Sequence, residues 1–280
     1  LMEIRRSEKA GIHITSIKGQ DLPLEAEKNV AGVAGLAMLE AHNPQLGFEI
    51  RIEKNIKPGS GIGSSAASAA GTVAGINYLL GNPFTNKELI PFAMEGERLA
   101  CGSAHADNVA PALLGGFTLV RDTNPLDICA LPTPLELVAT VIHPKIEVKT
   151  ADARAVLKER VTLEKAISQW GNVGALVSSL YEEDYDLLSR SLVDGIVEPA
   201  RSILIPYFKE LKAACKEGGA LGSGISGSGP SVFALSRGMS TANKVAQAMQ
   251  SVLEETNIPF DIHVSPVKKT GVSFIEDLLT

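Results

Sequence analysis

The sequence has 280 residues, of which 45% are apolar, 21% charged and 5% aromatic, with 26 glycines. This length suits two ordinary domains or one large one, and the balance excludes a disulfide-stapled miniprotein, a disordered chain and a collagen-like repeat. The 26 basic and 32 acidic residues leave a net charge of −6, which argues against a general electrostatic grip on nucleic acid or anionic lipid. Small molecules are therefore the expected partners.

The three cysteines, Cys101, Cys129 and Cys215, are an odd number at wide spacing and form no Cys-x-x-Cys pair. This pattern fits a reducing compartment, and the first eleven residues contain no apolar run of the kind that a signal peptide needs. We therefore expect a cytoplasmic protein. The first five residues alternate like a strand that is already under way, which predicts that a native segment precedes them.

The first half of the chain alternates short strand patterns with longer helical ones. A Gly-Asn-Pro sequence at 81–83 is a helix stop, and Thr85 with Glu88 three residues later has the spacing of a capping box. Helical periodicity begins at Asn29 and ends before Asn43-Pro44. We expect strands at 1–5, 12–17, 48–52 and 117–120, and helices at 29–41, 64–80 and 85–99.

A membrane span is the alternative for residues 58–86, because this stretch contains no Asp, Glu, Lys or Arg. Its apolar content is diluted by Gly, Ser and Asn, and the apolar run at 66–80 is shorter than the ~20 residues that a span requires. A buried helix is the better interpretation, and we predict no membrane association.

Crowded prolines mark the end of the first half, and we place a domain boundary there, giving domains 1–132 and 133–280. The second half is predicted to contain strands at 135–142, 231–235 and 260–264, helices at 152–157, 163–181, 202–217 and 241–256, and a second glycine-rich turn at 222–230. Strands and helices mix without strict alternation, which indicates an α+β fold.

The strongest local signal is the glycine-rich segment Pro58-Gly59-Ser60-Gly61-Ile62-Gly63-Ser64-Ser65-Ala66-Ala67, which lies between a predicted strand and a predicted helix. Glycines permit a tight turn with exposed N–H groups, and the positive end of the following helix favours an anion. A P-loop is excluded because no lysine follows the glycines. A dinucleotide fingerprint fits weakly, because the acidic residue expected ~20 positions later is absent. Flexible packing of a small-residue helix is the plain alternative.

The whole segment Pro-x-x-x-Gly-x-Gly-Ser-Ser-Ala-Ala resembles the ATP-binding loop of the GHMP kinases, which act on galactose, homoserine, mevalonate and phosphomevalonate. Three further segments are similar to the homoserine-phosphorylating branch of this family: Gly102–Phe117 with its His-Ala-Asp-Asn-Val-Ala-Pro run, 149–154, and Val197–Arg201. The second glycine loop, Ser226–Ser231, resembles the third motif of the family. The matches run in order from about Lys28 to Ser231.

The resemblance implies a two-lobed GHMP kinase fold, with an N-terminal lobe like domain 2 of ribosomal protein S5 and a ferredoxin-like C-terminal lobe. It implies ATP and Mg²⁺ as cofactors and L-homoserine as the substrate that receives the phosphoryl group, giving O-phospho-L-homoserine for threonine synthesis. The exposed apolar sheet edge of the family also implies a homodimer.

Site residues follow from the same resemblance. Pro58 to Ala67 would surround the triphosphate, and Ser65 and Glu97 would bind Mg²⁺. Glu95 is a rival for Glu97 by composition alone. Asn29 and Lys54 match positions that line the nucleotide base, although in isolation they indicate a helix cap and a surface charge. The residues assigned to the substrate are His105, Asn108, Thr150, Arg154, Arg201 and Gly227, of which the two arginines suit a carboxylate.

Position 108 determines whether a side chain is expected to act as general base, because mevalonate and galactose kinases carry at this position an aspartate that serves as the base. An amide accepts no proton at neutral pH, so Asn108 would position the substrate hydroxyl while a phosphate oxygen takes its proton. Asp107 is the rival base. Phosphoryl transfer depends mainly on positioning and charge neutralisation, so a kinase without a strong base is chemically reasonable.

One departure from the family is the absence of its first motif, a Pro-x-x-Ser-x-Asn-like segment near the N-terminus. We expect that the missing upstream residues carry it. Two rival functions stay open: a GHMP kinase for mevalonate or a sugar, and a non-catalytic GHMP-like protein that binds its ligand without turnover.

Overall fold

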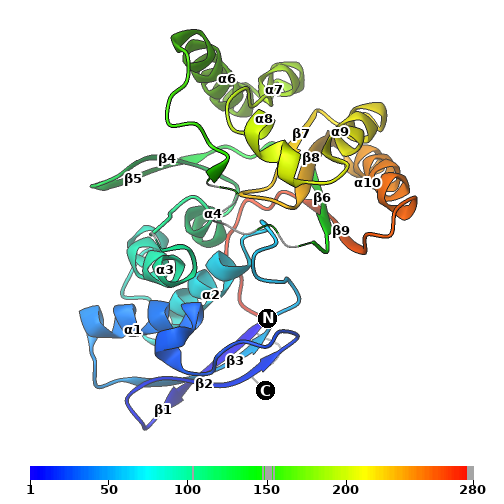
Figure 1. Cartoon of the computed structure of the whole chain (residues 1–280). Helices are drawn as coiled ribbons and strands as arrows, with labels where there is room; N and C mark the ends of the chain where they lie inside the picture. The colour runs from blue at the N-terminus through cyan, green and yellow to red at the C-terminus, as the bar shows by residue number, and fades with distance from the viewer. Residues whose placement is uncertain (103, 147, 149–152, 154, 276–280) are drawn as a thin grey trace. The chain divides into compact units, whose positions relative to one another are not determined.

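A computed structural model describes residues 1–102, 104–146, 148, 153 and 155–275, and Figure 1 shows the elements of the chain. Contacts divide the chain into two compact units. The first consists of Leu1–Pro58, Gly63–Ala130 and the segment from Lys268 onward, and the second of Gly59–Ile62 and Leu131–Val267.

The first unit is built on a three-stranded sheet with the order β1-β3-β2. Its strands are β1 (Met2–Ser7), β2 (Gly11–Lys18) and β3 (Gly47–Glu53). β3 pairs antiparallel with β1 and parallel with β2. Phe48, Ile50 and Ile52 are buried, whereas the residues between them are exposed, so one face of the sheet enters the core. The predicted strands here are confirmed: those at 12–17 and 48–52 are longer by one residue at each end, and the one predicted at 1–5 covers Met2–Ser7.

Three helices lie on one side of this sheet (Figure 1). They are α1 (Val30–His42), α2 (Ser64–Leu79) and α3 (Asn86–Cys101), and the short α4 (Val109–Leu114) follows. The predicted capping box is present, because the Thr85 hydroxyl accepts from the Glu88 N–H and the Glu88 carboxylate accepts from the Thr85 N–H. α2 is buried on most sides, as its charge-free sequence predicts. In the part of the chain that the structure describes, no helix is long and apolar enough to span a membrane.

The end of the chain returns to the first unit. The Gly116 N–H donates to the Lys268 carbonyl over 2.7 Å, and the rings of Tyr78 and Phe274 stack with centroids 4.5 Å apart. Gly116 directly precedes a hairpin made of β4 (Phe117–Thr123) and β5 (Leu126–Leu131). The predicted domain boundary is a single one at residue 132. The contacts instead assign Gly59–Ile62 to the second unit and 268–275 to the first.

The second unit contains a four-stranded antiparallel sheet with the order β7-β8-β6-β9. Its strands are β6 (Leu137–Pro144), β7 (Gly222–Ile225), β8 (Val232–Arg237) and β9 (Phe260–Pro266). Helices α9 (Phe208–Glu217) and α10 (Met239–Glu254) supply buried side chains to a core shared with the sheet. Among the described residues, α6 (Leu163–Glu182), α7 (Tyr185–Ser191) and α8 (Glu198–Arg201) also precede α9.

Two sequence predictions for the second unit need correction. The helix predicted at 202–217 is interrupted: a 3₁₀ turn covers Ser202–Leu204, Ile205 is extended, and α9 begins only at Phe208. Pro206 causes the break, because the residue before a proline avoids helical geometry. The glycine-rich turn predicted at 222–230 is shorter, since its first four residues form β7 against β8. The helix predicted at 152–157 includes positions outside the described residues.

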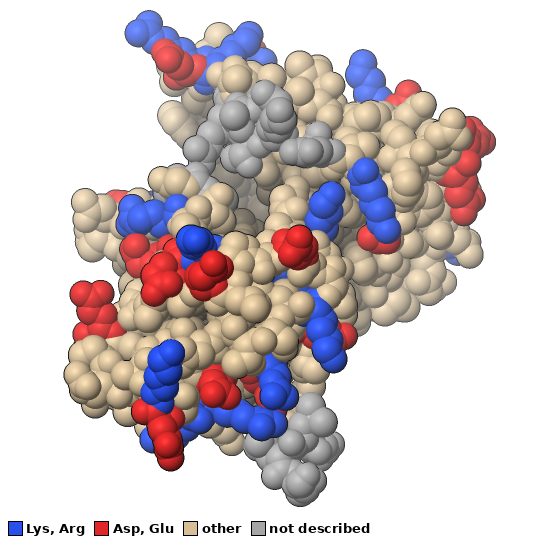
Figure 2. Space-filling model, turned by 60° about the horizontal axis from the view of Figure 1, so that its bottom comes forward, with Lys and Arg blue, Asp and Glu red and all other residues tan. Residues whose placement is uncertain are grey.

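Charged side chains of both signs are interspersed over the face of the molecule shown in Figure 2. On the sheet of the first unit, Glu3 pairs with Arg5 and lies 3.7 Å from Arg51. Pairs this exposed contribute little to stability.

Candidate active site

Two serines of the second unit donate hydrogen bonds to the backbone of the glycine loop. Ser231 Oγ donates to the Ser60 carbonyl over 2.6 Å, and Ser226 Oγ donates to the Gly61 carbonyl over 2.8 Å. Ser60 and Ser231 are buried, whereas Pro58 and Gly59 are exposed. Two successive carbonyls of the loop are thus fixed by one short turn, which restrains the backbone that a phosphate would contact.

Gly61 is required by this close approach. Its φ is +80°, and a Cβ added there would lie 2.4 Å from the Ser226 carbonyl oxygen and 2.8 Å from the Gly229 carbonyl oxygen. A side chain would therefore collide with backbone atoms that cannot move aside. The close approach of the two loops at Gly61 therefore requires glycine at this position.

His143 of β6 extends the same network. Its Nδ1 lies 3.1 Å from Ser231 Oγ, and both side chains are buried. The single hydroxyl hydrogen of Ser231 is already donated to Ser60, so Nδ1 is the donor toward Ser231. A chain of hydrogen bonds therefore runs from β6 through Ser231 to the glycine loop.

The start of α2 presents backbone N–H groups that the helix itself does not use. Gly63 is the N-cap, with φ +71°, and it has no side chain that could cap the helix. The first intrahelical bond to it comes from the Ala67 N–H, so the N–H groups of Ser64, Ser65 and Ala66 have no partner within the helix. Because α2 has 16 residues, its positive end adds to these donors, and the two features together favour an anion.

Lys54 is buried beneath this first turn. Its Nζ donates to the Ser64 carbonyl over 2.8 Å and to Ser68 Oγ over 2.6 Å. Burial lowers the pKa of the Lys54 ammonium, and the Glu97 carboxylate opposes that change. The interpretation of Lys54 as a surface charge is therefore wrong, and its ammonium fixes the start of α2 from the inside.

Glu97 of α3 is buried, with 3% of its surface exposed, and Ser65 of α2 lies close enough to its carboxyl group to affect its pKa. Burial raises the pKa of this carboxyl, and the nearby Asp107 raises it further, whereas Ser65, His105 and Lys54 act in the opposite direction. Among the described residues Glu97 Oε1 is a buried atom with no hydrogen-bond partner. Glu95, the rival by composition, is half-buried and pairs with Arg98 at 2.9 Å.

This pair of side chains fits Mg²⁺. A buried carboxylate oxygen without a partner is costly unless a cation or donor completes it. A carboxylate and a hydroxyl on neighbouring helices are hard oxygen ligands of the kind that Mg²⁺ accepts, with phosphate oxygens and water as the remaining ligands.

Asn108 stands at the start of α4 with its side chain exposed and not used as a cap. Its Oδ1 is 3.5 Å from the position that a Cβ on Gly63 would occupy, so it lies beside the start of α2. His105 and Asp107 are also exposed. The structure therefore brings Ser65, Glu97 and Asn108 together within the first unit, as the resemblance implies.

Asn29 acts as a helix cap. Its Oδ1 accepts from the Ala31 N–H over 3.0 Å, and its Nδ2 donates to the Pro23 carbonyl over 2.8 Å. The side chain is buried, and both of its polar groups are already bonded. The plain interpretation of Asn29 as a cap is confirmed, and it supports α1 from within the unit.

Arg201, at the end of α8, is oriented by two backbone carbonyls of the second unit. Its Nε donates to the Ala153 carbonyl over 3.1 Å, and its Nη1 donates to the Gly227 carbonyl over 3.3 Å. A guanidinium has five N–H donors, so this arrangement leaves others for a ligand. Arg154 and Thr150, the other predicted substrate residues on this side, lie outside the described residues.

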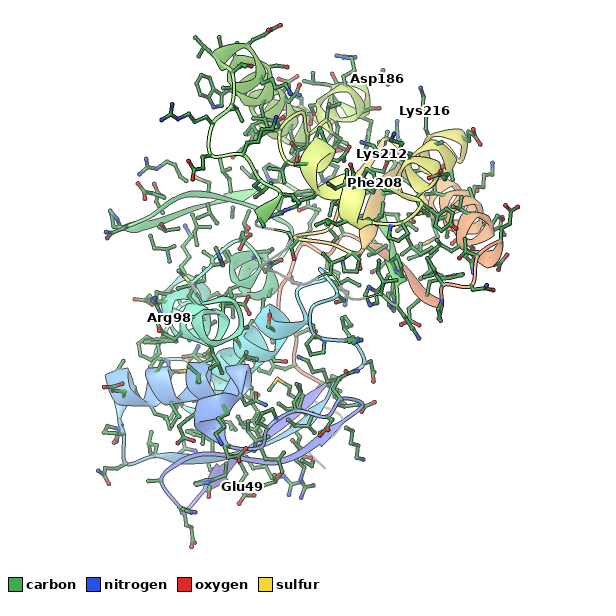
Figure 3. All side chains as sticks on the ribbon, in the orientation of Figure 1. Glu49, Arg98, Asp186, Phe208, Lys212 and Lys216 are labelled. Atoms are coloured by element: carbon green, nitrogen blue, oxygen red, sulfur yellow. The ribbon has the colours of Figure 1, made fainter. Side chains whose placement is uncertain are left out.

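α8 itself is anchored at both ends of its first turn. The Asp194 carboxylate accepts from the N–H groups of Ile196, Val197 and Glu198 at 2.8 to 3.0 Å. The Glu198 carboxylate pairs with Lys212 of α9, and Figure 3 shows Lys212 beside Phe208 on the same helix. Glu198 and Arg201 also line a cavity of about 220 Å³ within the second unit.

Sequence reasoning missed the residues that hold the site in place. Asp194 is followed by glycine, which signals a turn, and Ser231 ends the second glycine loop, but His143 and Lys212 carry no local signal. Their partners are distant in sequence: 171 residues separate Ser231 from Ser60.

Two family profiles match this chain. The profile of the GHMP kinases N terminal domain matches residues 28–116, and that of the GHMP kinases C terminal domain matches residues 176–255. The chain belongs to the GHMP kinase family. All the residues assigned above to the loop, to Mg²⁺ and to the phosphoryl acceptor in the first unit lie inside the N-terminal match.

Individual relatives are similar over nearly the whole chain. The homoserine kinase of Chlorobium phaeobacteroides strain BS1 is 48% identical over 284 residues, which cover 96% of this chain and 88% of that protein. The crystal structure of homoserine kinase from Cytophaga hutchinsonii has a TM-score of 0.92 and 52% identity, covering 96% of this chain and 86% of that one. The L. major mevalonate kinase, at 17% identity and a TM-score of 0.67, shares the fold.

Proposed function

We propose that this chain transfers the γ-phosphoryl group of ATP to the side-chain hydroxyl of L-homoserine, giving O-phospho-L-homoserine. The observation that carries the proposal is the similarity to a homoserine kinase structure at 52% identity and a TM-score of 0.92 over 96% of the chain. Mevalonate and other GHMP kinases of known structure share only the fold at 14 to 22% identity. The product is an intermediate for threonine synthesis, and because ATP is the donor we place the reaction in the cytoplasm.

The triphosphate is assigned to the loop from Pro58 to Ala67. The N–H groups at the start of α2, which have no partner within the helix, and the dipole of its 16 residues support an anion there. The hydrogen bonds from Ser226 and Ser231 fix the loop carbonyls before ATP binds. Binding therefore does not have to supply the free energy of ordering the loop. Lys54 and Asn29 support the first turns of α2 and α1 in this proposal.

Ser65 and Glu97 would hold Mg²⁺, with their remaining partners supplied by phosphate oxygens and water. When bound, the ion would neutralise negative charge on the β- and γ-phosphates. Glu97 Oε1, which has no hydrogen-bond partner among the described residues, and the nearness of Ser65 to the same carboxyl group support this assignment.

The carboxylate of homoserine is assigned to Arg201, whose guanidinium can donate two parallel hydrogen bonds. The carbonyls of Ala153 and Gly227 fix the plane of that group. Arg154 and Thr150 are proposed to complete the carboxylate site, and His105 and Gly227 to bound the rest of the substrate.

Asn108 is proposed to position the acceptor hydroxyl. A bond forms between the homoserine side-chain oxygen and the γ-phosphorus while the bond from that phosphorus to the leaving ADP oxygen breaks. The hydroxyl proton passes to an oxygen of the transferred phosphoryl group, because an amide cannot accept it. Catalysis then rests on orientation and charge neutralisation, which suits a loose phosphoryl-transfer transition state.

The test is coupled ADP release with Mg-ATP and, in parallel, homoserine, mevalonate, galactose or no acceptor. We expect turnover with homoserine alone. Turnover with mevalonate or galactose instead would move the assignment to another substrate of the family. Binding of ATP with no turnover on any acceptor would support a non-catalytic ligand-binding protein.

A further inference from the structure

His143 lies near the end of β6, and its contact with Ser231 follows from the register of the sheet. The pairing of β6 with β8 ends at Ile142 and Val232. The next residues in the same antiparallel register are His143 and Ser231, and side chains directly opposed in such a pair lie within reach of each other. The distance of 3.1 Å from His143 Nδ1 to Ser231 Oγ agrees with this placement. The strand pairing therefore brings the two side chains together.

The backbone around Ser231 is held by hydrogen bonds of its own. The Ser226 N–H donates to the Ser231 carbonyl over 2.8 Å, and the Gly229 N–H donates to the Ser226 carbonyl over 2.9 Å. Ser231 is also fully buried. With its backbone fixed and its oxygen buried, the hydroxyl can still turn about its C–O bond, and this rotation decides where its hydrogen points.

His143 restricts this rotation. A serine hydroxyl has one hydrogen and two lone pairs, and the N–H at His143 Nδ1 occupies one of the lone pairs. The hydrogen is then directed to the Ser60 carbonyl, which lies 2.6 Å from Ser231 Oγ. Without a donor at position 143, the hydroxyl could turn its hydrogen away from Ser60. His143 therefore acts on the glycine loop through Ser231.

The direction of the Ser60 carbonyl also sets the direction of a donor. A trans peptide group is planar, so its carbonyl and the N–H of the next residue point in opposite directions. Because the buried Ser231 hydroxyl binds the Ser60 carbonyl, the Gly61 N–H is directed away from Ser231. Gly61 belongs to the loop assigned to the triphosphate, in which backbone N–H groups are the expected phosphate donors.

We propose that His143 is a positioning residue for ATP. It orients the Ser231 hydroxyl, and that hydroxyl holds the Ser60–Gly61 peptide group with its N–H toward the triphosphate. The proposal rests on the assignment of ATP to this loop. Because its test measures the binding of nucleotide alone, a failure of the proposed transfer to homoserine would not alter the result.

The first test measures binding of a non-hydrolysable ATP analogue with Mg²⁺ by calorimetry, with no acceptor present. His143→Leu should raise the dissociation constant by roughly fivefold, which is the effect of one hydrogen bond of average net strength. The matched control is His263→Leu, because His263 is an exposed histidine on β9, the other strand paired with β6. The control should bind the analogue as the wild type does.

Two amide variants separate orientation from packing. The amide nitrogen of Asn is attached at the same point of the side chain as Nδ1 of His, whereas that of Gln is one bond further out. Because His143→Asn can still donate to Ser231, its affinity should stay within about twofold of the wild type. His143→Gln should behave like His143→Leu, and it replaces that variant should the latter not fold. Both amides disturb the packing of the buried ring, so a purely structural role would lower the affinity of both alike.

A double-mutant cycle shows whether the effect passes through Ser231. In a Ser231→Ala background, His143→Leu should cause no further loss of affinity, because the hydroxyl that His143 orients is gone. In a Ser226→Ala background, His143→Leu should still weaken binding, since the Ser226 hydroxyl donates to a different carbonyl, that of Gly61.

Amide hydrogen exchange gives a readout without any ligand. Exchange at residues 60–62 should be faster in His143→Leu and in Ser231→Ala than in the wild type, and nearly unchanged in His143→Asn. An unchanged dissociation constant in His143→Leu, equal losses in the Asn and Gln variants, or a loss that persists undiminished in the Ser231→Ala background would each overturn the proposal.

Discussion

Ser231 Oγ donates to the carbonyl of Ser60 over 2.6 Å, although 171 residues separate the two in the chain. The hydroxyl also receives the hydrogen bond of His143 and is itself fully buried. The Ser231 side chain therefore links β6, in the four-stranded sheet, to the glycine loop.

Ser231→Ala should raise the KM for ATP and leave the KM for homoserine nearly unchanged. Leaving the buried Ser60 carbonyl unpaired costs about 1–3 kcal/mol, which corresponds to roughly 5- to 150-fold. Steady-state kinetics with each substrate varied in turn measure the split. Ser251→Ala, which removes an exposed hydroxyl bonded within α10, should change neither constant. Equal loss for both substrates would indicate general unfolding.

Glu97→Gln should reduce turnover by at least roughly 100-fold and raise the Mg²⁺ concentration needed for half-maximal rate. The amide removes a negative ligand where charge on the phosphates must be neutralised. Glu95→Gln is the control two residues away, and it should stay within about twofold because Glu95 only forms an exposed pair with Arg98. Activity that depends on Glu95 rather than Glu97 would reverse the metal assignment.

Asn108→Ala should lower kcat by roughly 100-fold, because the acceptor hydroxyl loses its positioning group. Asp107→Ala should have a smaller effect, since Asp107 acts on Glu97 only through charge. Rapid-quench measurement of the phosphoryl-transfer step separates chemistry from product release. The opposite ranking would make Asp107 the base.

Lys212→Met should raise the KM for homoserine by roughly 10-fold with little change for ATP. The Glu198 carboxylate keeps 14% of its surface exposed and would lose its partner, which loosens the short helix that ends at Arg201. Lys212→Arg should restore binding. Lys216→Met, one turn further along α9 and exposed, is the matched control, and both lysines are labelled in Figure 3. A loss in thermal stability without a change in KM would restrict the pair to a structural role.

Cys215 should make stability fall with pH above the ordinary thiol range. Burial raises the pKa of this thiol from 9.0 to about 11, so between these values the folded state holds a proton that the unfolded state has lost. Stability contributed by the protonated thiol is complete below pH 9 and lost as the pH rises through 11, by about 3 kcal/mol. Denaturant unfolding at several pH values should show this excess slope in the wild type and not in Cys215→Ala. Parallel curves for the two proteins would contradict it.

The local pattern of the sequence determined most of the elements and the chemistry of the phosphate loop. Alternation located β2 and β3, the capping box of Thr85 and Glu88 located the start of α3, and glycines followed by a small-residue helix predicted an anion site. These signals are readable because turns, caps and periodicity depend on residues a few positions apart. The resemblance to GHMP kinases added roles for Glu97 and Asn108 that spacing alone could not assign.

Tertiary structure decided what those residues are attached to. Lys54 has the sequence environment of a surface lysine and is buried under α2, and the segment from Lys268 returns to the first unit. Ser231 and Lys212 gain their meaning from partners in other elements. Burial and long-range hydrogen bonds join residues that are far apart along the chain, so no local window contains both halves of the interaction.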